Sequence, residues 1–346
     1  MHGGDVYRNK VKLDFSININ PMGAPDSANT ALTTTLFEME QYPDIKCEGL
    51  RRALSEYYLV SEERIVCGNG ASELIMAICH AKRPKTALLA APCFQGYETA
   101  LAAVDTKISY HLLEEERKFV LDESFATKIL ETSPEIVFLA NPNNPTGMLV
   151  DKNVMLSVAN ACKMVKATLV IDECYMELVK RNEEYSFIGL EKHFTNVIIL
   201  RAYTETYALP GLRLGYAICS TVELQREILH QLPEWNISMM AQNVGIVALR
   251  EKKYLGNSIK VVDEQRYILS NRLRELGIRT YPSNANYILI RETRTDLYTK
   301  LLERGVLIRD CSDYVGLGKG YYRIAVKRVP QNESLLRYLR EILAHE

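Results

Sequence analysis

Hydrophobic and polar positions follow two different patterns along the chain. Between residues 64 and 220, short runs rich in β-branched and aliphatic residues alternate with longer segments of helical periodicity. We predict strands at 64–67, 86–90, 136–140, 168–171, 197–200 and 216–219, with helices at 72–81 and 152–164 among the segments between them. This alternation is typical of an α/β fold with a mostly parallel sheet covered by helices.

The pattern changes after a predicted long helix at 257–276. Strands at 278–281, 286–290, 306–308 and 321–326, with helices at 295–304 and 332–344, predict a smaller α+β domain at the C-terminal end. We therefore expect an N-terminal arm over residues 1–35, a large domain over 36–255 and a small domain over 256–346. The arm is rich in loops around residues 18–21, and an arm of this kind often covers a site or reaches a partner subunit.

Composition and charge narrow the class of protein. A chain of 346 residues with 47% hydrophobic and 25% charged residues has enough apolar surface for one large and one smaller core. The net charge of -1, with Lys and Arg spread along the chain, provides no basic surface for nucleic acid. The polar N-terminus and the lack of an apolar run of roughly 18 residues predict neither secretion nor insertion in a membrane.

The 8 cysteines show no Cys-x-x-Cys pair and no spacing to histidine that is typical of zinc sites. Their simplest interpretation is that they are reduced thiols in or near hydrophobic cores. We therefore expect a cytoplasmic protein without a metal site.

A glycine-rich turn follows the first predicted strand. Residues 68–73, Gly-Asn-Gly-Ala-Ser-Glu, lead into an apolar helical pattern, so free backbone N–H groups at Gly70, Ala71 and Ser72 are able to bind an anion such as phosphate. The alternative is that Ser72 and Glu73 only cap the helix. The spacing is not that of a dinucleotide-binding or Walker loop.

Two further predicted strands end in polar residues. Residues 141–147, Asn-Pro-Asn-Asn-Pro-Thr-Gly, follow the strand at 136–140, and Asp172 and Glu173 follow the strand at 168–171, with Tyr175 close behind. Ligands of open α/β sheets bind at this C-terminal edge. The simpler alternatives are a rigid turn for the first segment and helix caps for the two carboxylates.

The most specific segment is 200–216, Leu-Arg-Ala-Tyr-Thr-Glu-Thr-Tyr-Ala-Leu-Pro-Gly-Leu-Arg-Leu-Gly-Tyr. With the motifs above, it resembles the pyridoxal 5′-phosphate (PLP)-dependent aminotransferases of fold type I. Glu205, eight residues before Arg213, occupies the position at which that family has its cofactor-binding lysine. The resemblance covers nearly the whole chain and is closest to the threonine-phosphate decarboxylases of cobalamin biosynthesis, which are related to histidinol-phosphate aminotransferases. Further segments that carry it are 2–4, 14–21, 41–44, 306–311 and 321–326.

The resemblance implies how the cofactor ring would bind. Asp172 would pair with the pyridine nitrogen, so that the ring can accept electrons. Asn144 and Tyr175 would hydrogen-bond the phenolic oxygen of the ring, and Tyr97 would stack on its face. Without the resemblance, an aromatic residue at the position of Tyr97 is more often part of a core.

The resemblance also implies contacts to phosphate and substrate. The cofactor phosphate would bind Gly70, Ala71, Ser72, Thr204 and Arg213. Tyr42 would reach this site from the second subunit of a homodimer. A small phosphorylated amino acid would bind through His2, Asn18, Arg309 and Arg323, since two guanidinium groups suit a substrate with two anionic ends. Without the resemblance, each arginine is more simply a surface salt-bridge partner, and His2 is no more than part of the chain terminus.

Glu205 departs from the pattern of the family. The lysine of the family binds the cofactor covalently and moves protons, whereas a carboxylate moves protons but cannot form that bond. Glu205 also brings negative charge close to Asp172 and the phosphate, so either its pKa is raised or cofactor affinity falls. Ala202 replaces a hydroxyl residue that binds the phosphate in many relatives. We therefore expect PLP to be bound weakly and without a covalent bond.

Several explanations of Glu205 stay open at this point. The residue is natural in a protein with lost or altered chemistry, or it was introduced into an active enzyme, or it supports a reaction on a preformed cofactor–substrate adduct. The leading hypothesis for function is a PLP-dependent decarboxylase of O-phospho-L-threonine, with Glu205, Asp172 and Tyr175 as catalytic candidates. The alternatives are a histidinol-phosphate-type aminotransferase and a non-catalytic binder of PLP or of a phosphorylated amino acid.

Overall fold

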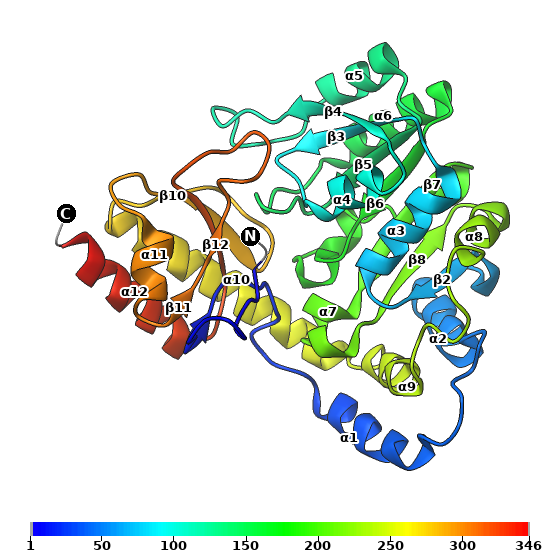
Figure 1. Ribbon diagram of the computed structural model, residues 1–346, viewed down its shortest axis with the longest axis horizontal. Helices are drawn as coiled ribbons and strands as arrows, with labels where there is room; N and C mark the ends of the chain where they lie inside the picture. Colours follow the sequence, from blue (N-terminus) through cyan, green and yellow to red (C-terminus); the bar gives the residue numbers. More distant parts are fainter. Residues whose placement is uncertain (1–2, 345–346) are drawn as a thin grey trace.

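A seven-stranded sheet organises the larger lobe of the computed structural model, which describes residues 3–344 (Figure 1). Its strands lie in the order β2-β8-β7-β6-β5-β3-β4, and β8 runs antiparallel to its two neighbours. The strands are β2 (Ile65–Gly68), β3 (Thr86–Ala91), β4 (Lys107–Leu112), β5 (Ile136–Ala140), β6 (Thr168–Asp172), β7 (Val197–Ala202) and β8 (Gly215–Cys219). The predicted α/β fold with a mostly parallel sheet is confirmed.

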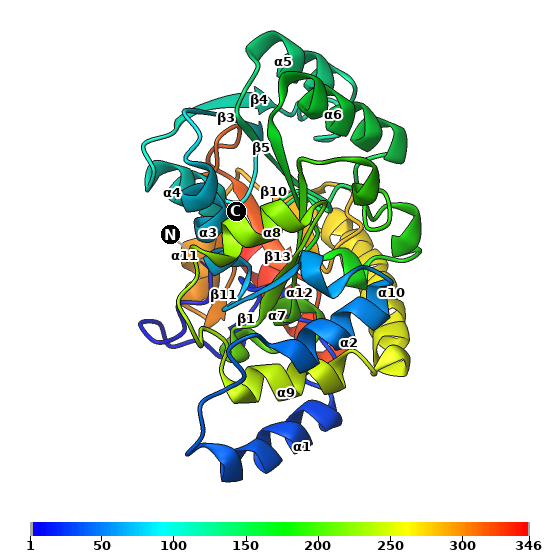
Figure 2. The same ribbon diagram turned by 90° about the vertical axis from the view of Figure 1, so that its right-hand side faces the viewer.

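Helices cover both faces of this sheet, and each face has its own core (Figure 2). On one face lie α3 (Ala71–Lys82), α4 (Gly96–Ala102) and α8 (Val222–Leu229). On the other face lie α2 (Glu48–Tyr58), α5 (Ser124–Thr132), α6 (Lys152–Val165) and α9 (Met239–Ala248). Because alternate residues of a strand point to opposite faces, burial of both faces explains why these strands are continuous apolar runs.

A second, four-stranded sheet forms the smaller lobe. Its order is β12-β13-β10-β9, with antiparallel pairing throughout. The strands are β9 (Arg279–Thr280), β10 (Tyr287–Arg291), β12 (Arg309–Asp310) and β13 (Tyr321–Ala325), and the helices are α10 (Lys252–Glu275), α11 (Leu297–Leu302) and α12 (Val329–Leu343). The long helix α10 begins five residues before its predicted start, so the proposed boundary at 255/256 falls inside it.

The N-terminal arm is joined to the small lobe and also crosses the site. Its strand β1 (Leu13–Asp14) pairs in parallel with β11 (Val306–Leu307). Farther along, the backbone N–H of Asn20 donates to the carbonyl of Glu205 at 3.0 Å. The side chain of Asn20 donates to the carbonyl of Thr206 at 2.8 Å. The arm therefore holds the segment that carries Glu205.

Some elements were not predicted. The arm contains α1 (Asp26–Thr35), a threonine-rich helix that projects from the lower end of the molecule and packs on α9 (Figures 1 and 2). Strand β4 lies at the edge of the sheet and is only partly buried, so it lacks the apolar run of its neighbours. The shortest helices are η1 (Leu36–Glu38), η2 (Glu62–Arg64), η3 (Met176–Leu178), η4 (Asn182–Glu184), η5 (Glu191–His193), α7 (Tyr203–Thr206) and η6 (Pro210–Leu212).

The structure also shows the state of the cysteines, the character of the helices and the arrangement of possible metal ligands. All 8 cysteines are buried as free thiols, as the sequence predicted. Among residues 3–344, no helix combines the length and the apolar character needed to cross a bilayer. Within the same residues, no group of three or more His, Cys, Asp or Glu side chains is arranged to hold a metal ion.

Candidate active site

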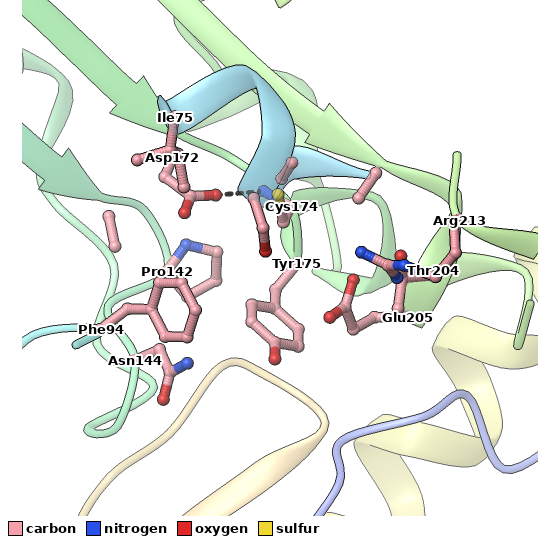
Figure 3. Close-up of a pocket in the computed structure, with 14 residues that line it drawn as sticks. Ile75, Phe94, Pro142, Asn144, Asp172, Cys174, Tyr175, Thr204, Glu205 and Arg213 are labelled. Carbon is pink, nitrogen blue, oxygen red and sulfur yellow. Dashed lines mark hydrogen bonds between the residues drawn. The ribbon is translucent and has the colours of Figure 1, made fainter. Parts of the chain in front are cut away.

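A cavity of about 140 Å³ lies at the C-terminal edge of the large sheet (Figure 3). The strands β5, β6 and β7 end there at Ala140, Asp172 and Ala202. The other lining residues are Ala71, Ser72, Ile75, Phe94, Pro142, Asn144, Cys174, Tyr175, Thr204, Glu205 and Arg213. Eight residues predicted for the site from the sequence thus meet around one cavity, although they come from distant parts of the chain.

One end of the cavity is suited to a phosphate. Helix α3 begins at Ala71, so the backbone N–H groups of Ala71 and Ser72 lie at its positive end. Gly70 has a φ of 86°, and a Cβ atom there would lie only 2.2 Å from the guanidinium of Arg213. The glycine therefore allows Arg213 to lie against the start of the helix. Thr204 adds a hydroxyl group to the same wall of the cavity.

Asp172 is held by two hydrogen bonds at the end of β6. Its Oδ2 atom accepts from the hydroxyl of Tyr97 at 2.6 Å. Its Oδ1 atom accepts from the backbone N–H of Cys174 at 3.0 Å (Figure 3). The carboxylate is therefore fixed in orientation, as pairing with a protonated ring nitrogen requires.

The position of Tyr97 corrects the sequence prediction. Tyr97 is buried in the core, where its ring stacks on Phe138 with centroids 4.9 Å apart, and it does not line the cavity. Phe94, which precedes α4 in the same motif, has its ring in the cavity wall instead (Figure 3). Because the first turn of α4 packs against the sheet, it directs Tyr97 into the core beneath Asp172. Phe94 is therefore the residue placed to stack on a ring.

Other lining residues were missed from the sequence. Ile75 stands one helical turn after Ala71 on α3, so the helical period could have placed it on the same face. Cys174 and Pro142 stand next to predicted site residues, but nothing in their sequence distinguishes them from core or turn residues.

A network of polar side chains lines the opposite side. Asn144 accepts a 2.5 Å hydrogen bond from Arg323 through Oδ1, which leaves its Nδ2 group to donate to a ligand oxygen. Tyr175 accepts a 3.2 Å hydrogen bond from Asn18. Burial raises the pKa of Tyr175, and the negative charge of Glu205 raises it further. The hydroxyl of Tyr175 therefore keeps its proton and is able to donate.

Arg309 and Arg323 lie directly opposite each other on strands β12 and β13. Both are almost fully buried, with 4% and 7% of their surface exposed. Arg309 donates to Gln95 at 2.9 Å and to Asp313 at 3.0 Å, whereas Arg323 donates to the carbonyl of Ser16 at 2.8 Å. They are therefore not surface salt-bridge residues, although neither forms the wall of the cavity itself.

Tyr42 and His2 are the remaining residues predicted for the site. Tyr42 is 79% exposed, and its ring packs on Trp235 with ring centroids 5.0 Å apart. It does not line the cavity of its own chain. Its contact with a second subunit stays a prediction. His2 lies outside the described residues.

Glu205 faces the cavity from α7, between Tyr175 and Arg213 (Figure 3). Its Oε2 atom is buried and has no hydrogen-bond partner within the described part of the chain. Burial raises its pKa to about 7, the charge of Asp172 adds to this effect, and Arg213 and Arg323 act in the opposite direction. The sequence predicts either a raised pKa of Glu205 or a lower affinity for the cofactor, and the structure agrees with the raised pKa.

Comparisons with known proteins decide the family. The profile of the family described as aminotransferase class I and II matches residues 10–339. The chain belongs to this family. It is 34% identical to a threonine-phosphate decarboxylase of Salmonella typhimurium, over 96% of this chain and 91% of that protein. It is 32% identical to a histidinol-phosphate aminotransferase of Ruminiclostridium cellulolyticum, over 96% of this chain and 92% of that protein.

A solved structure agrees with this membership. The histidinol-phosphate aminotransferase of Clostridium acetobutylicum superimposes with a TM-score of 0.90 and 29% identity, over 96% of this chain and 100% of that one. The class I and II aminotransferase family consists of PLP-dependent aminotransferases and decarboxylases. The predicted family and fold are therefore both confirmed.

The residues of the cavity fit the phosphate, the ring face and the ring nitrogen of PLP, although Ala202 provides no hydroxyl group for the phosphate. The start of α3 with Thr204 and Arg213 suits the phosphate, Phe94 suits the ring face, and Asp172 suits the ring nitrogen. No lysine lines the cavity within the described residues, and the Oε2 atom of Glu205 is buried there without a hydrogen-bond partner among them.

Proposed function

We propose that this protein is of the threonine-phosphate decarboxylase type and that its site binds PLP together with O-phospho-L-threonine or a similar small amino acid. The observation that carries the proposal is the pairing of Arg309 with Arg323 across β12 and β13. Two buried guanidinium groups at neighbouring positions suit a ligand with a carboxylate at one end and a phosphate at the other. The names of the relatives support the same class of ligand, since both relatives act on phosphorylated compounds.

Each residue of the cavity would have a distinct task. PLP, when bound, supplies an electron-accepting ring that stabilises negative charge at the α-carbon of the substrate. Asp172, held by Tyr97 and Cys174, keeps a proton on the ring nitrogen. Phe94 excludes water from one face of the ring, and Tyr175 with Asn144 orients it.

Glu205 would exchange protons but would not hold the cofactor. With a pKa of about 7, its carboxyl group is present in both protonation states near neutral pH. A positioned acid or base contributes roughly 10² to 10⁴ to the rate of such reactions. A carboxylate cannot form the covalent bond that a lysine makes with the cofactor. We therefore expect turnover by this chain to be far slower than turnover by a variant with a lysine at this position.

The proposal is tested by assaying Glu205→Lys with both classes of substrate. We expect Glu205→Lys to release CO₂ from O-phospho-L-threonine and the unmodified chain to do so roughly 100-fold more slowly, about 2.7 kcal/mol in the barrier, because a carboxylate cannot form the covalent bond to the cofactor. Amino transfer from histidinol phosphate to 2-oxoglutarate without CO₂ release would favour the histidinol-phosphate aminotransferase instead.

A second candidate function is binding without turnover. The absence of a lysine among the described lining residues favours it, because that residue type is the one on which the covalent chemistry depends. Turnover of O-phospho-L-threonine by the unmodified chain at a rate comparable with that of Glu205→Lys would exclude this candidate.

We also propose a homodimer. The segment that joins α1 to α2 exposes Leu36, Phe37, Met39 and Tyr42, and Phe37 is 88% exposed. A run of exposed large apolar side chains on such a connecting segment is typical of a surface that a second copy covers. Sedimentation of the unmodified chain and of Phe37→Asp tests this, and we expect the substitution to shift the dimer to monomer. We place the dimer in the cytoplasm, where its 8 free thiols stay reduced.

A further inference from the structure

The cavity contains a carboxylate oxygen that has no hydrogen-bond partner among residues 3–344. The Oε2 atom of Glu205 is buried and accepts no hydrogen bond from any described residue. Buried polar atoms of folded proteins are nearly always hydrogen-bonded, so an exception that faces a cavity suggests that a ligand supplies the partner.

Neither of the two cations near Glu205 is hydrogen-bonded to its free oxygen. Arg323 donates to Asn144 at 2.5 Å and to the carbonyl of Ser16 at 2.8 Å, and Arg213 donates to the carbonyl of Pro210 at 3.2 Å. Both influence Glu205 only through space, because no hydrogen bond joins either of them to its free oxygen. The missing partner is therefore expected to be a positively charged donor on the ligand.

We propose that Glu205 makes the site select the amine form of the cofactor, pyridoxamine 5′-phosphate, over the aldehyde form, PLP. This inference rests on the proposed function, because it takes the cavity to be the cofactor site. The two forms share the ring and the phosphate and differ only in the group on one carbon. That group is an ammonium in the first form and an aldehyde in the second.

The position of Glu205 explains why the difference matters. In the family, the lysine at this position is bonded to the carbon of the variable group itself, which is the aldehyde carbon of PLP. A glutamate side chain reaches one atom less far than a lysine side chain, which leaves space for a nitrogen that belongs to the ligand. An ammonium in that space donates to Oε2 in a charge-assisted hydrogen bond. An aldehyde presents an oxygen instead, so Glu205 must first take up a proton.

The contacts at the other end of the ligand do not discriminate between the two forms. The phosphate group meets Ala71, Ser72 and Arg213 in both, and Asp172 meets the same ring nitrogen. The ratio of the two dissociation constants therefore depends almost entirely on Glu205. A hydrogen bond to a charged group corresponds to roughly 10- to 100-fold in affinity.

The test is to measure the dissociation constants of both cofactor forms by calorimetry, using the full-length protein stripped of cofactor. We compare the unmodified chain with Glu205→Gln, which keeps the size of the side chain but removes its charge. Glu333→Gln, at an exposed position of α12, controls for the loss of one negative charge elsewhere. Arg213→Ala is expected to weaken both forms equally, because it acts on the shared phosphate.

We expect the unmodified chain and Glu333→Gln to bind the amine form roughly 10- to 100-fold more tightly than PLP. We expect Glu205→Gln to lose that preference. Equal affinities in the unmodified chain, tighter binding of PLP, or a preference that persists in Glu205→Gln would overturn the inference while leaving the proposed cofactor site in place. Failure of both forms to bind would overturn the inference and the proposed function together.

Discussion

The hydroxyl of Tyr97 donates a 2.6 Å hydrogen bond to Asp172 from the core beneath the cavity. Since Tyr97 stacks on Phe138 rather than on a ligand, it acts on the site only through this carboxylate. Tyr97→Phe removes the hydrogen bond and keeps the ring. We expect cofactor affinity to fall roughly 10-fold, because hydrogen bonds to charged groups contribute about 1.5 to 3 kcal/mol. Fluorescence titration measures the change. An unaltered affinity would show that Asp172 binds the cofactor equally well without the hydrogen bond from Tyr97.

Phe94 provides the contrasting prediction, since its ring lines the cavity. We expect Phe94→Ala to weaken binding of the cofactor by roughly 10-fold, from the loss of buried contact and stacking worth about 0.5 to 1.5 kcal/mol beyond area alone. Phe94→Tyr keeps the ring face and serves as the matched control. If Phe94→Ala binds the cofactor as tightly as Phe94→Tyr does, Phe94 is not the stacking residue.

The paired arginines are expected to bind the substrate. Arg309→Gln and Arg323→Gln each remove one guanidinium from the pair. We expect the affinity for O-phospho-L-threonine to fall roughly 100-fold in each, because a charge-assisted contact is lost, with cofactor affinity nearly unchanged in Arg309→Gln. Arg340→Gln, on the exposed side of α12, is the control. The role assigned to the pair is wrong if Arg309→Gln and Arg340→Gln bind this amino acid equally well.

The pKa of Glu205 leads to a prediction about stability without ligand. Burial raises that pKa from 4.5 to about 7, and the charge of Asp172 assists, so the folded state binds more protons than the unfolded state between these two values. Stability therefore falls as pH rises from 4.5 to 7, by roughly 3 kcal/mol in total. The other titratable and charged groups that face Glu205 are Cys174, Tyr175, Arg213 and Arg323.

Glu205→Gln removes this dependence because an amide does not titrate. We expect the variant to melt at a higher temperature than the unmodified chain at pH 8 and at nearly the same temperature at pH 5. Differential scanning fluorimetry at both pH values measures the two differences. Identical melting differences at pH 5 and pH 8 would contradict the raised pKa.

Glu115 links the two lobes. It follows β4 in the large lobe and accepts a hydrogen bond from Tyr321 at 2.6 Å, while Arg279 and Arg291 of the small lobe lie at 2.9 and 3.1 Å. Burial acts to raise its pKa, but hydrogen bonds from Tyr281 and Tyr321 and the two arginine charges outweigh burial, so the pKa is lowered. The stabilising contribution is therefore present above 4.5 and is lost as pH falls through the lowered pKa.

We expect Glu115→Gln to loosen this contact by about 1 to 2 kcal/mol, because an amide replaces a charged acceptor. Hydrogen exchange of the backbone between residues 113 and 120 should become faster. Glu114→Gln changes the exposed neighbour and is the control. Equal exchange rates in the two variants would show that Glu115 does not hold the lobes together.

The sequence predicted the fold better than it predicted the contacts of the site. The continuous apolar runs of the central strands come from burial on both sides, so their positions could be predicted to within two residues. The edge strand β4 lacks that signal because it is only partly buried. Phe94 lines the cavity instead of Tyr97 because of how α4 is rotated against the sheet. The spacing of two aromatic residues in one motif does not show that rotation.

Contacts between distant segments could not be predicted from the sequence for a related reason. The hydrogen bond from Arg323 to Asn144 joins residues 179 positions apart, and that from Asn18 to Tyr175 joins residues 157 apart. No local pattern encodes such a pairing, because it depends on how the small lobe and the arm pack on the large lobe. The departure from the family pattern at Glu205 stays a prediction, because it depends on the motif around that residue and not on a contact that the structure shows.

The central claim is that the site keeps its contacts for PLP but has lost the means to bind it covalently. Borohydride reduction of the PLP-loaded protein, followed by peptide mass measurement, tests this claim most directly. The account predicts no stoichiometric phosphopyridoxyl group on any lysine of the unmodified chain, and one such group on the introduced lysine of Glu205→Lys. One equivalent on a lysine of the unmodified chain, such as Lys327, whose pKa is lowered by burial, would contradict it.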